Sequence, residues 1–160
     1  MHAVRTRGGI PPGRLWGATI LTGLALACAG TRPVHVGITQ SGLADCPASP
    51  NCVSSDAQDS AHRVSPFLLA VPPAQAWGAT REAVAALPDT RIVASSASRL
   101  HAESTSDLFG FVDDLELQLR PAQRLIAVRS ASRKGYGDLG VNRERVETLR
   151  ATLTESGILQ

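Results

Sequence analysis

A stretch with a strand-like pattern runs from Val112 to Arg120, and its apolar and polar residues alternate without interruption from Asp114 onward. Leu115, Leu117 and Leu119 point to one side of an extended chain, and the polar residues between them point to the other. This period of two is typical of a half-buried β-strand with one apolar face and one polar face.

Shorter stretches with the same period lie on both sides of this strand. They cover Arg91–Ala94, Arg99–Thr105 and Leu125–Ser132, and only a few residues separate each stretch from the next. Because connections this short cannot hold a crossover, the four segments predict an antiparallel meander.

Two stretches with a helical period enclose the predicted strands. The alanine-rich stretch Pro73–Leu87 stops before a proline, and Asn142–Leu153 carries Val146, Leu149 and Leu153 on one side. The predicted fold class is therefore α+β: a two-layer sandwich in which a four-stranded antiparallel meander sheet carries two helices on one face.

Burial alone predicts the register of the last two strands. A four-residue loop at 121–124 places Leu117 opposite Val128 on the apolar face and Glu116 opposite Arg129 on the polar face. A slip of one residue would place Glu116 opposite Val128 and bury a charge, so this register is strongly favoured.

The polar face then collects charged residues. It carries Glu103, Asp114, Glu116, Arg129 and Arg133. One interpretation is a solvated face with cross-strand ion pairs, each contributing less than about 1 kcal/mol. The other is a binding face or shallow cleft, because the charges gather at one end of the sheet.

The segment Arg129–Arg143 leads from a strand into a helix and contains Gly135, Gly137 and Gly140. Backbone amides at a helix N-terminus and guanidinium groups suit a carboxylate or a phosphate. The glycines alternatively serve only to permit positive φ in a tight turn. The candidate ligand-binding residues are Asp114, Glu116, Arg129, Arg133, Tyr136 and Arg143.

Cys46 and Cys52 have five residues between them, two of which are proline. A local disulfide is the leading interpretation, and a reduced pair is the alternative. A zinc site lacks further ligands at a suitable spacing. We therefore expect no metal and no cofactor.

No catalytic residue is predicted. The histidines form no helical i, i+4 pair, and no G-x-S-x-G segment is present. Ser54 or Ser130 could be combined with His101 and Asp113 into a hydrolase triad, but any serine-rich chain permits such a combination. The sequence leaves enzyme activity undecided and favours its absence.

The N-terminal residues indicate where in the cell the protein is located. Three arginines precede the apolar stretch Leu15–Ala27, which runs directly into Cys28. This pattern is typical of a lipoprotein signal, in which the cysteine is lipidated and becomes the first residue of the mature chain. It predicts a signal peptide at 1–27, a flexible tether at 28–44 and a single α+β domain at 45–155.

The charge of the mature chain argues against nucleic-acid binding. The formal net charge of +2 falls to −1 without the signal, because the signal contains three of the 16 basic residues and none of the 14 acidic ones. Ala29 follows Cys28 where an aspartate would indicate inner-membrane retention. We therefore expect an outer-membrane lipoprotein that faces the periplasm.

Three ordered motifs carry a resemblance to a known family. They are Cys46-Pro-x-Ser-Pro-Asn-Cys52-Val-Ser-Ser, Phe109-Gly-Phe-Val-Asp-Asp114, and Arg129-Ser-Ala-Ser-Arg133 with Gly137-Asp-Leu-Gly-x-Asn-Arg143. Together they resemble domain-of-unknown-function family 1499 over residues 43–153. Lys134 is a slight departure from its pattern. The resemblance implies one domain, frequently lipid-anchored or exported in bacteria, and it offers no established enzyme activity to transfer to this chain.

Three functions are compatible with the sequence. The first is a non-catalytic, lipid-anchored envelope protein that binds an anionic small molecule or an envelope protein. The second is an envelope hydrolase acting on a substrate with a phosphate or carboxylate. The third is a purely structural lipoprotein.

Overall fold

The computed structural model describes His2, residues 42–106 and residues 110–160. The predicted signal peptide, the lipidation site Cys28 and most of the predicted tether lie outside these residues. No helix within the described residues is long and apolar enough to cross a membrane.

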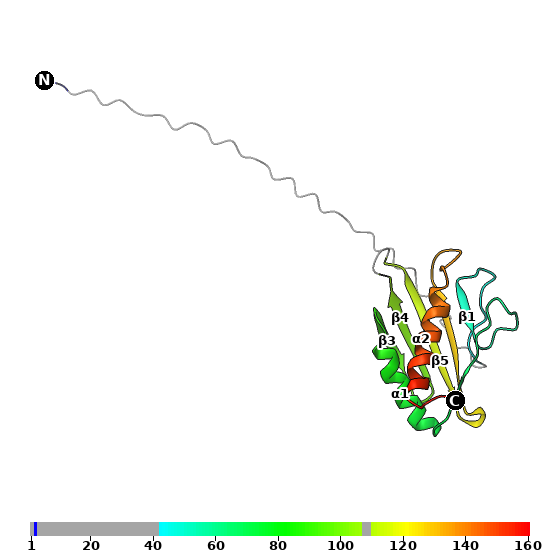
Figure 1. Cartoon of the computed structure of the whole chain (residues 1–160). Coiled ribbons are helices and arrows are strands. Elements are labelled where there is room, and N and C mark those ends of the chain that lie inside the picture. The colour runs from blue at the N-terminus through cyan, green and yellow to red at the C-terminus, as the bar shows by residue number, and fades with distance from the viewer. Residues whose placement is uncertain (1, 3–41, 107–109) are drawn as a thin grey trace.

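The described chain forms one sheet and two long helices (Figure 1). The strands are β1 (Cys52–Ser54), β2 (Phe67–Leu68), β3 (Thr90–Ser95), β4 (Arg99–Thr105), β5 (Val112–Arg120) and β6 (Leu125–Ser132). The helices are α1 (Pro73–Ala85), α2 (Val141–Glu155) and the short 3-10 helix η1 (Pro121–Gln123).

The sheet is antiparallel and has six strands, so the α+β class is confirmed and the predicted number of four strands is wrong. Its order is β1-β6-β5-β4-β3, and β2 also pairs with β6. The segment 45–73, in which no strand was predicted, supplies the two additional strands. They contain three and two residues, too few to show a period of two, and they form because β6 offers them a free edge.

The predicted meander is confirmed in its register. Leu117 pairs with Val128 and Glu116 pairs with Arg129, as burial on one face requires. The bounds of β4, β5 and β6 coincide with those expected from the alternation.

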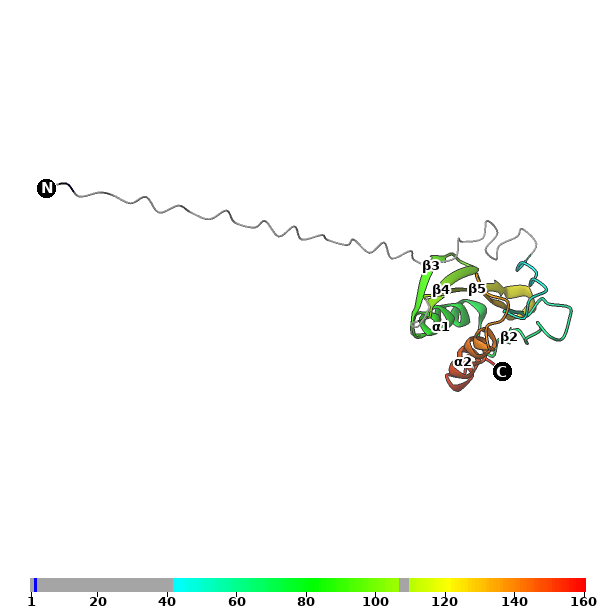
Figure 2. The ribbon, with the colours of Figure 1, turned by 90° about the horizontal axis from the view of Figure 1, so that it is seen from above.

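Both helices lie on the same side of the sheet, as Figure 2 shows. Their buried residues, among them Trp77, Val84, Val146 and Leu149, pack with the leucines of β5 in one core cluster. Burying these side chains is the main driving force for the two-layer arrangement. The other face of the sheet carries His101 and Glu103 of β4, Asp114 and Glu116 of β5 and Arg129 of β6.

The chain on either side of the core is also held in place. The predicted disulfide between Cys46 and Cys52 is confirmed, with its Cα atoms 5.6 Å apart. At the C-terminus, Ile158 and Leu159 are buried in the core, and Leu159 forms an isolated bridge with Leu69.

Candidate functional site

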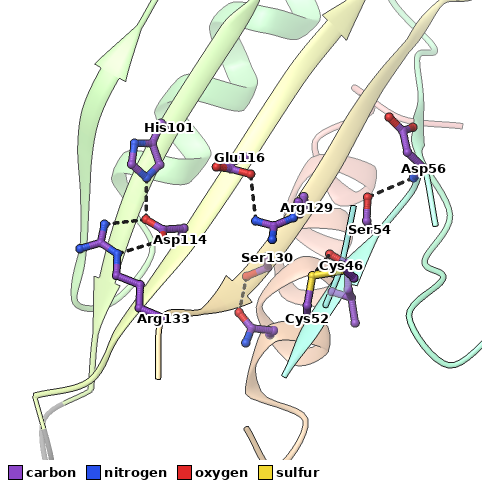
Figure 3. Close-up of polar contacts among 12 residues, drawn as sticks. Cys46, Cys52, Ser54, Asp56, His101, Asp114, Glu116, Arg129, Ser130 and Arg133 are labelled. Atoms are coloured by element: carbon purple, nitrogen blue, oxygen red, sulfur yellow. Dashed lines mark hydrogen bonds and ion pairs between the residues drawn. A yellow bond between two sulfur atoms is a disulfide. The ribbon is translucent and has the colours of Figure 1, made fainter. Parts of the chain in front are cut away.

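Charged side chains from three central strands and from the chain just after β6 meet on the face opposite the helices (Figure 3). We call this group, together with Arg91 from β3, the charged cluster. Its members are Arg91, His101, Glu103, Asp114, Glu116, Arg129 and Arg133. Three guanidinium groups thus face three carboxylates.

Asp114 is the centre of one half of the cluster. Its Oδ1 lies 2.7 Å from Nε2 of His101 and accepts a 2.6 Å hydrogen bond from an Nη of Arg133. Its Oδ2 accepts a second hydrogen bond, of 2.9 Å, from Nε of Arg133. The guanidinium therefore holds the carboxylate through two parallel bonds, the strongest geometry for this pair.

Arg133 also joins Glu103 to this half. The same Nη donates to Glu103 at 2.6 Å, and Arg91 donates to the other oxygen of Glu103 at 2.9 Å. These contacts raise the pKa of Arg133, above all through the hydrogen bond to Asp114, so the guanidinium stays charged. Burial would raise the pKa of Asp114, but its hydrogen bonds with His101 and Arg133 outweigh burial and lower the pKa.

Glu116 and Arg129 form the other half. An Nη of Arg129 donates to Oε2 of Glu116 at 3.1 Å. The other oxygen of Glu116, Oε1, and the Nε of Arg129 are buried and have no hydrogen-bond partner. Burial raises the pKa of Glu116, and the charge of Arg129 offsets this only in part.

The cluster is not a solvated face. The side chains of Glu116, Asp114 and Arg133 are 1%, 4% and 6% exposed. Solvent-exposed ion pairs contribute little to the free energy of unfolding, whereas burying a charged group lowers it unless the charge is paired. The interpretation as solvent-exposed pairs therefore fails for these residues.

A small hollow borders the cluster. It has a volume of about 150 Å³ and is lined by residues 94–96, Arg99 and His101. His101 is the cross-strand neighbour of Glu116. The hollow is therefore one strand away from the unpartnered carboxylate oxygen.

Three members of the cluster are potential metal ligands. One ligand atom from each of His101, Glu103 and Asp114 lies within 4.8 Å of the others. The guanidinium of Arg133 donates to both carboxylates, so a cation at this position would have to displace Arg133. The pattern along each strand does not reveal this group, because its members come together only when β4 pairs with β5.

The glycine-rich turn does not present a free helix N-terminus. The carboxylate of Asp138 accepts hydrogen bonds from the backbone amides of Gly140 at 3.0 Å and Asn142 at 2.9 Å. Burial of Asp138 is outweighed by these bonds, which lower its pKa. An internal carboxylate thus occupies the place expected for an external anion.

Two candidate binding residues lie apart from the charged cluster. Tyr136 is 78% exposed, and Arg143 donates to the backbone oxygens of Ala61 and Arg63 at 2.8 and 2.9 Å. Arg143 therefore attaches α2 to the segment between β1 and β2. The other four candidates, Asp114, Glu116, Arg129 and Arg133, do come together.

A second polar group lies on the helix side of the sheet and was not expected. Ser130 donates to Asn142 at 2.6 Å, and Arg145 donates to Ser130 and, at 2.7 Å, to Asp113. The hypothetical triad is not assembled, because Asp113 and Ser130 lie on this side and His101 lies on the other. The periodicity of α2 could have indicated Arg145, since it follows Asn142 by three residues.

A family model described as "Protein of unknown function (DUF1499)" matches residues 42–153. The chain belongs to this family. The match contains every helix and strand of the structure except the last two residues of α2. Searches among curated proteins and among solved structures gave no match.

The DUF1499 domain of this chain thus contains both polar groups. The charged cluster lies on the face of its sheet opposite the helices, and the Ser130–Asn142–Arg145 group lies under its last helix. The two groups share β5 and β6 and project from opposite faces of them.

Proposed function

We propose that this DUF1499 protein is a lipoprotein of the bacterial cell envelope, anchored through Cys28 in the outer membrane and facing the periplasm. The apolar stretch that ends at Cys28 supports an anchor, and Ala29 in the next position favours the outer membrane. The Cys46–Cys52 disulfide gives independent support, because disulfides persist mainly in oxidising compartments.

Metabolic labelling with a fatty-acid analogue tests the anchor. The wild-type chain should incorporate the label, and Cys28→Ala should not. Separation of inner and outer membranes then tests the location. Equal labelling of both chains would contradict the anchor, and labelled protein in the inner membrane would contradict the location.

Within this envelope protein, the charged cluster is a binding site for a small polar ligand and not a catalytic site. The observation that carries this proposal is the pair of unpartnered buried atoms, Oε1 of Glu116 and Nε of Arg129. Buried polar atoms are nearly always hydrogen-bonded, so a pair without partners calls for a group that supplies both.

The two atoms define the chemistry of the ligand. Nε of Arg129 requires an acceptor, and the ionised Oε1 of Glu116 requires a donor. A carboxylic acid or a primary amide offers both side by side. An anionic carboxylate fits when Glu116 is protonated, and burial favours that form by raising the pKa of Glu116.

The Arg133 half of the cluster has a structural role in this proposal. Arg133 already donates three hydrogen bonds to two carboxylates, which leaves it poorly placed to capture an anion. A hydrolase would rest on the His101–Asp114 pair. Among the described residues, no hydroxyl or thiol is hydrogen-bonded to His101 as a nucleophile would require.

Nuclear magnetic resonance of the arginine side chains provides the test. Acetate and acetamide are titrated against isotope-labelled protein while the Nε–H signal of Arg129 is followed. Arg145 is the matched control, because it pairs with Asp113 at the same 12% side-chain exposure on the other face of the sheet. We expect a saturable shift of the Arg129 signal that is absent for Arg145 and weakened in Glu116→Gln.

The result also separates binding from a purely structural role. An Arg129 signal that responds to neither compound but exchanges magnetisation with a bound water would mean that water fills the gap. The charged cluster would then serve only the fold.

A further inference from the structure

Exposed apolar side chains gather at one end of the sheet, and none of them belongs to the charged cluster. At this end β5 begins, β6 ends and α2 begins. Of the five large apolar side chains that are exposed among the described residues, four lie here: Phe111, Tyr136, Leu139 and Val141. We call these four residues the apolar tip.

Leu139 is the most unusual member of the tip. Its side chain is fully exposed, and its φ of +55° lies in the left-handed region, followed by Gly140 at +86°. Neither property stabilises the fold. The left-handed conformation is unfavourable for leucine, and an exposed leucine side chain contributes no hydrophobic burial. Such local conflicts concentrate at functional positions.

A pocket opens beside these side chains. It has a volume of about 250 Å³, and Phe111, Leu139 and Val141 form its apolar walls. Lys134, the only lysine of the chain, lies on its border and is exposed. The tip therefore combines an apolar surface, an aromatic hydroxyl and a long cationic side chain.

We propose that the apolar tip inserts into the interface of the membrane that holds the lipid anchor. This rests on the proposed anchoring at Cys28. Tyrosine is favoured at bilayer interfaces because its ring is apolar and its hydroxyl is polar, and lysine extends its charge toward the lipid headgroups. The lysine gives the tip a preference for anionic lipids.

The acidic groups next to the pocket do not oppose insertion. Asp113 is paired with Arg145 at 2.7 Å, and Asp138 accepts hydrogen bonds from the backbone amides of Gly140 and Asn142. Donor groups of the domain itself therefore compensate the negative charges of both carboxylates. Among the described residues that line the pocket, Lys134 is therefore the charged side chain that these contacts leave to a lipid surface.

The tether is long enough for the apolar tip to face the membrane that holds the lipid anchor. Gly42 lies beside the guanidinium of Arg120, at the end of β5 away from the tip. The nine residues of β5 span about 30 Å. Residues 29–41 reach about 45 Å when fully extended, so the tip can touch the membrane to which Cys28 is attached.

Brominated lipids test insertion in the mature, lipidated chain that begins at Cys28. Tyr136→Trp places a fluorophore at the tip, and Gln123→Trp places one in η1, the exposed turn at the other end of β6. Both chains are bound to vesicles of phosphatidylethanolamine and phosphatidylglycerol, with and without bromine on the acyl chains. The parent chain supplies the background of Trp77, the tryptophan that remains once residues 1–27 are removed.

We expect the bromine to quench the fluorophore at position 136 and to leave the Gln123→Trp fluorophore unquenched, because an aromatic ring at the bilayer interface lies close to the acyl chains. Adding Leu139→Asn should abolish the quenching at position 136. Asparagine tolerates the left-handed conformation, so this change removes the apolar side chain and leaves the turn intact. Circular dichroism should be the same for all variants.

Flotation of the vesicles separates this proposal from the anchor. A chain that floats while both fluorophores stay unquenched overturns tip insertion and leaves the anchor standing. A chain that neither floats nor is quenched overturns both. A tip that is unquenched on vesicles but crosslinks to an envelope protein, with the crosslink lost in Leu139→Asn, assigns the tip to a protein partner and overturns the membrane proposal.

Discussion

Replacing Arg133 with methionine should destabilise the protein strongly. The side chain of Arg133 is 6% exposed and donates three hydrogen bonds, two to Asp114 and one to Glu103. Methionine has a similar volume, so the main effect is that two buried carboxylates lose a partner. Removing one member of a buried ion pair costs about 3–5 kcal/mol.

The expected loss lies at the lower end of this range. Asp114 keeps its contact with His101, and Glu103 keeps its contact with Arg91. We expect the free energy of unfolding at pH 7 to fall by about 3 kcal/mol, which corresponds to a decrease in Tm of about 10 °C. Urea unfolding followed by circular dichroism measures both variants under the same conditions.

Arg91→Met is the matched control. Arg91 donates to the same carboxylate, Glu103, but its side chain is 74% exposed. Its removal should cost less than about 1 kcal/mol. If Arg133→Met lost no more stability than Arg91→Met, the reasoning from burial would be refuted.

The pH dependence gives a second check on Arg133→Met. The pKa of Asp114 in the folded protein lies below the usual 3.8, so its ionised form contributes stability above that value. This contribution disappears as the pH falls through the lowered pKa. The gap between the wild type and Arg133→Met should therefore narrow below pH 3.8, and a gap independent of pH would contradict the pairing with Asp114.

Three further predictions concern other residues of the domain. Replacing Cys46 and Cys52 with serine should lower the free energy of unfolding by about 2 kcal/mol, measured in urea, since the closed loop is short; unchanged stability would contradict this. Asp138→Ala should cost about 1 kcal/mol through the lost cap of α2, with Asp138→Asn nearly neutral as the control. Burial raises the pKa of Glu116, so its contribution to stability falls as the pH rises above 4.5. Glu116→Gln should gain stability relative to the wild type over that interval, and parallel pH profiles would disprove it.

The strand pattern predicted the bounds of β5 and β6 to the residue, because the local pattern matches the burial of one face in the folded sheet. Each apolar residue of β5 is followed by a polar one, and one face of the strand packs on the helices, so burial permits a single register. The pairing of Glu116 with Arg129 followed from that register. The face of the sheet that holds most of the charged cluster could thus be read from the sequence.

The two short strands could not be predicted in this way. β1 and β2 contain three and two residues, and prolines occur in the chain around both. Their hydrogen bonds come from the edge of β6, more than 50 residues later in the chain. Only the folded sheet provides this edge.

The sequence by itself determined the α+β class, the meander, its register and which residues share the charged face, because period and parity are local properties of the chain. Tertiary structure decided how deeply that face is buried. It also decided that Arg133 is held by two carboxylates, while Glu116 and Arg129 each keep an unpartnered atom. Burial and side-chain geometry depend on what packs around a residue in space, so a strand pattern carries no information about them.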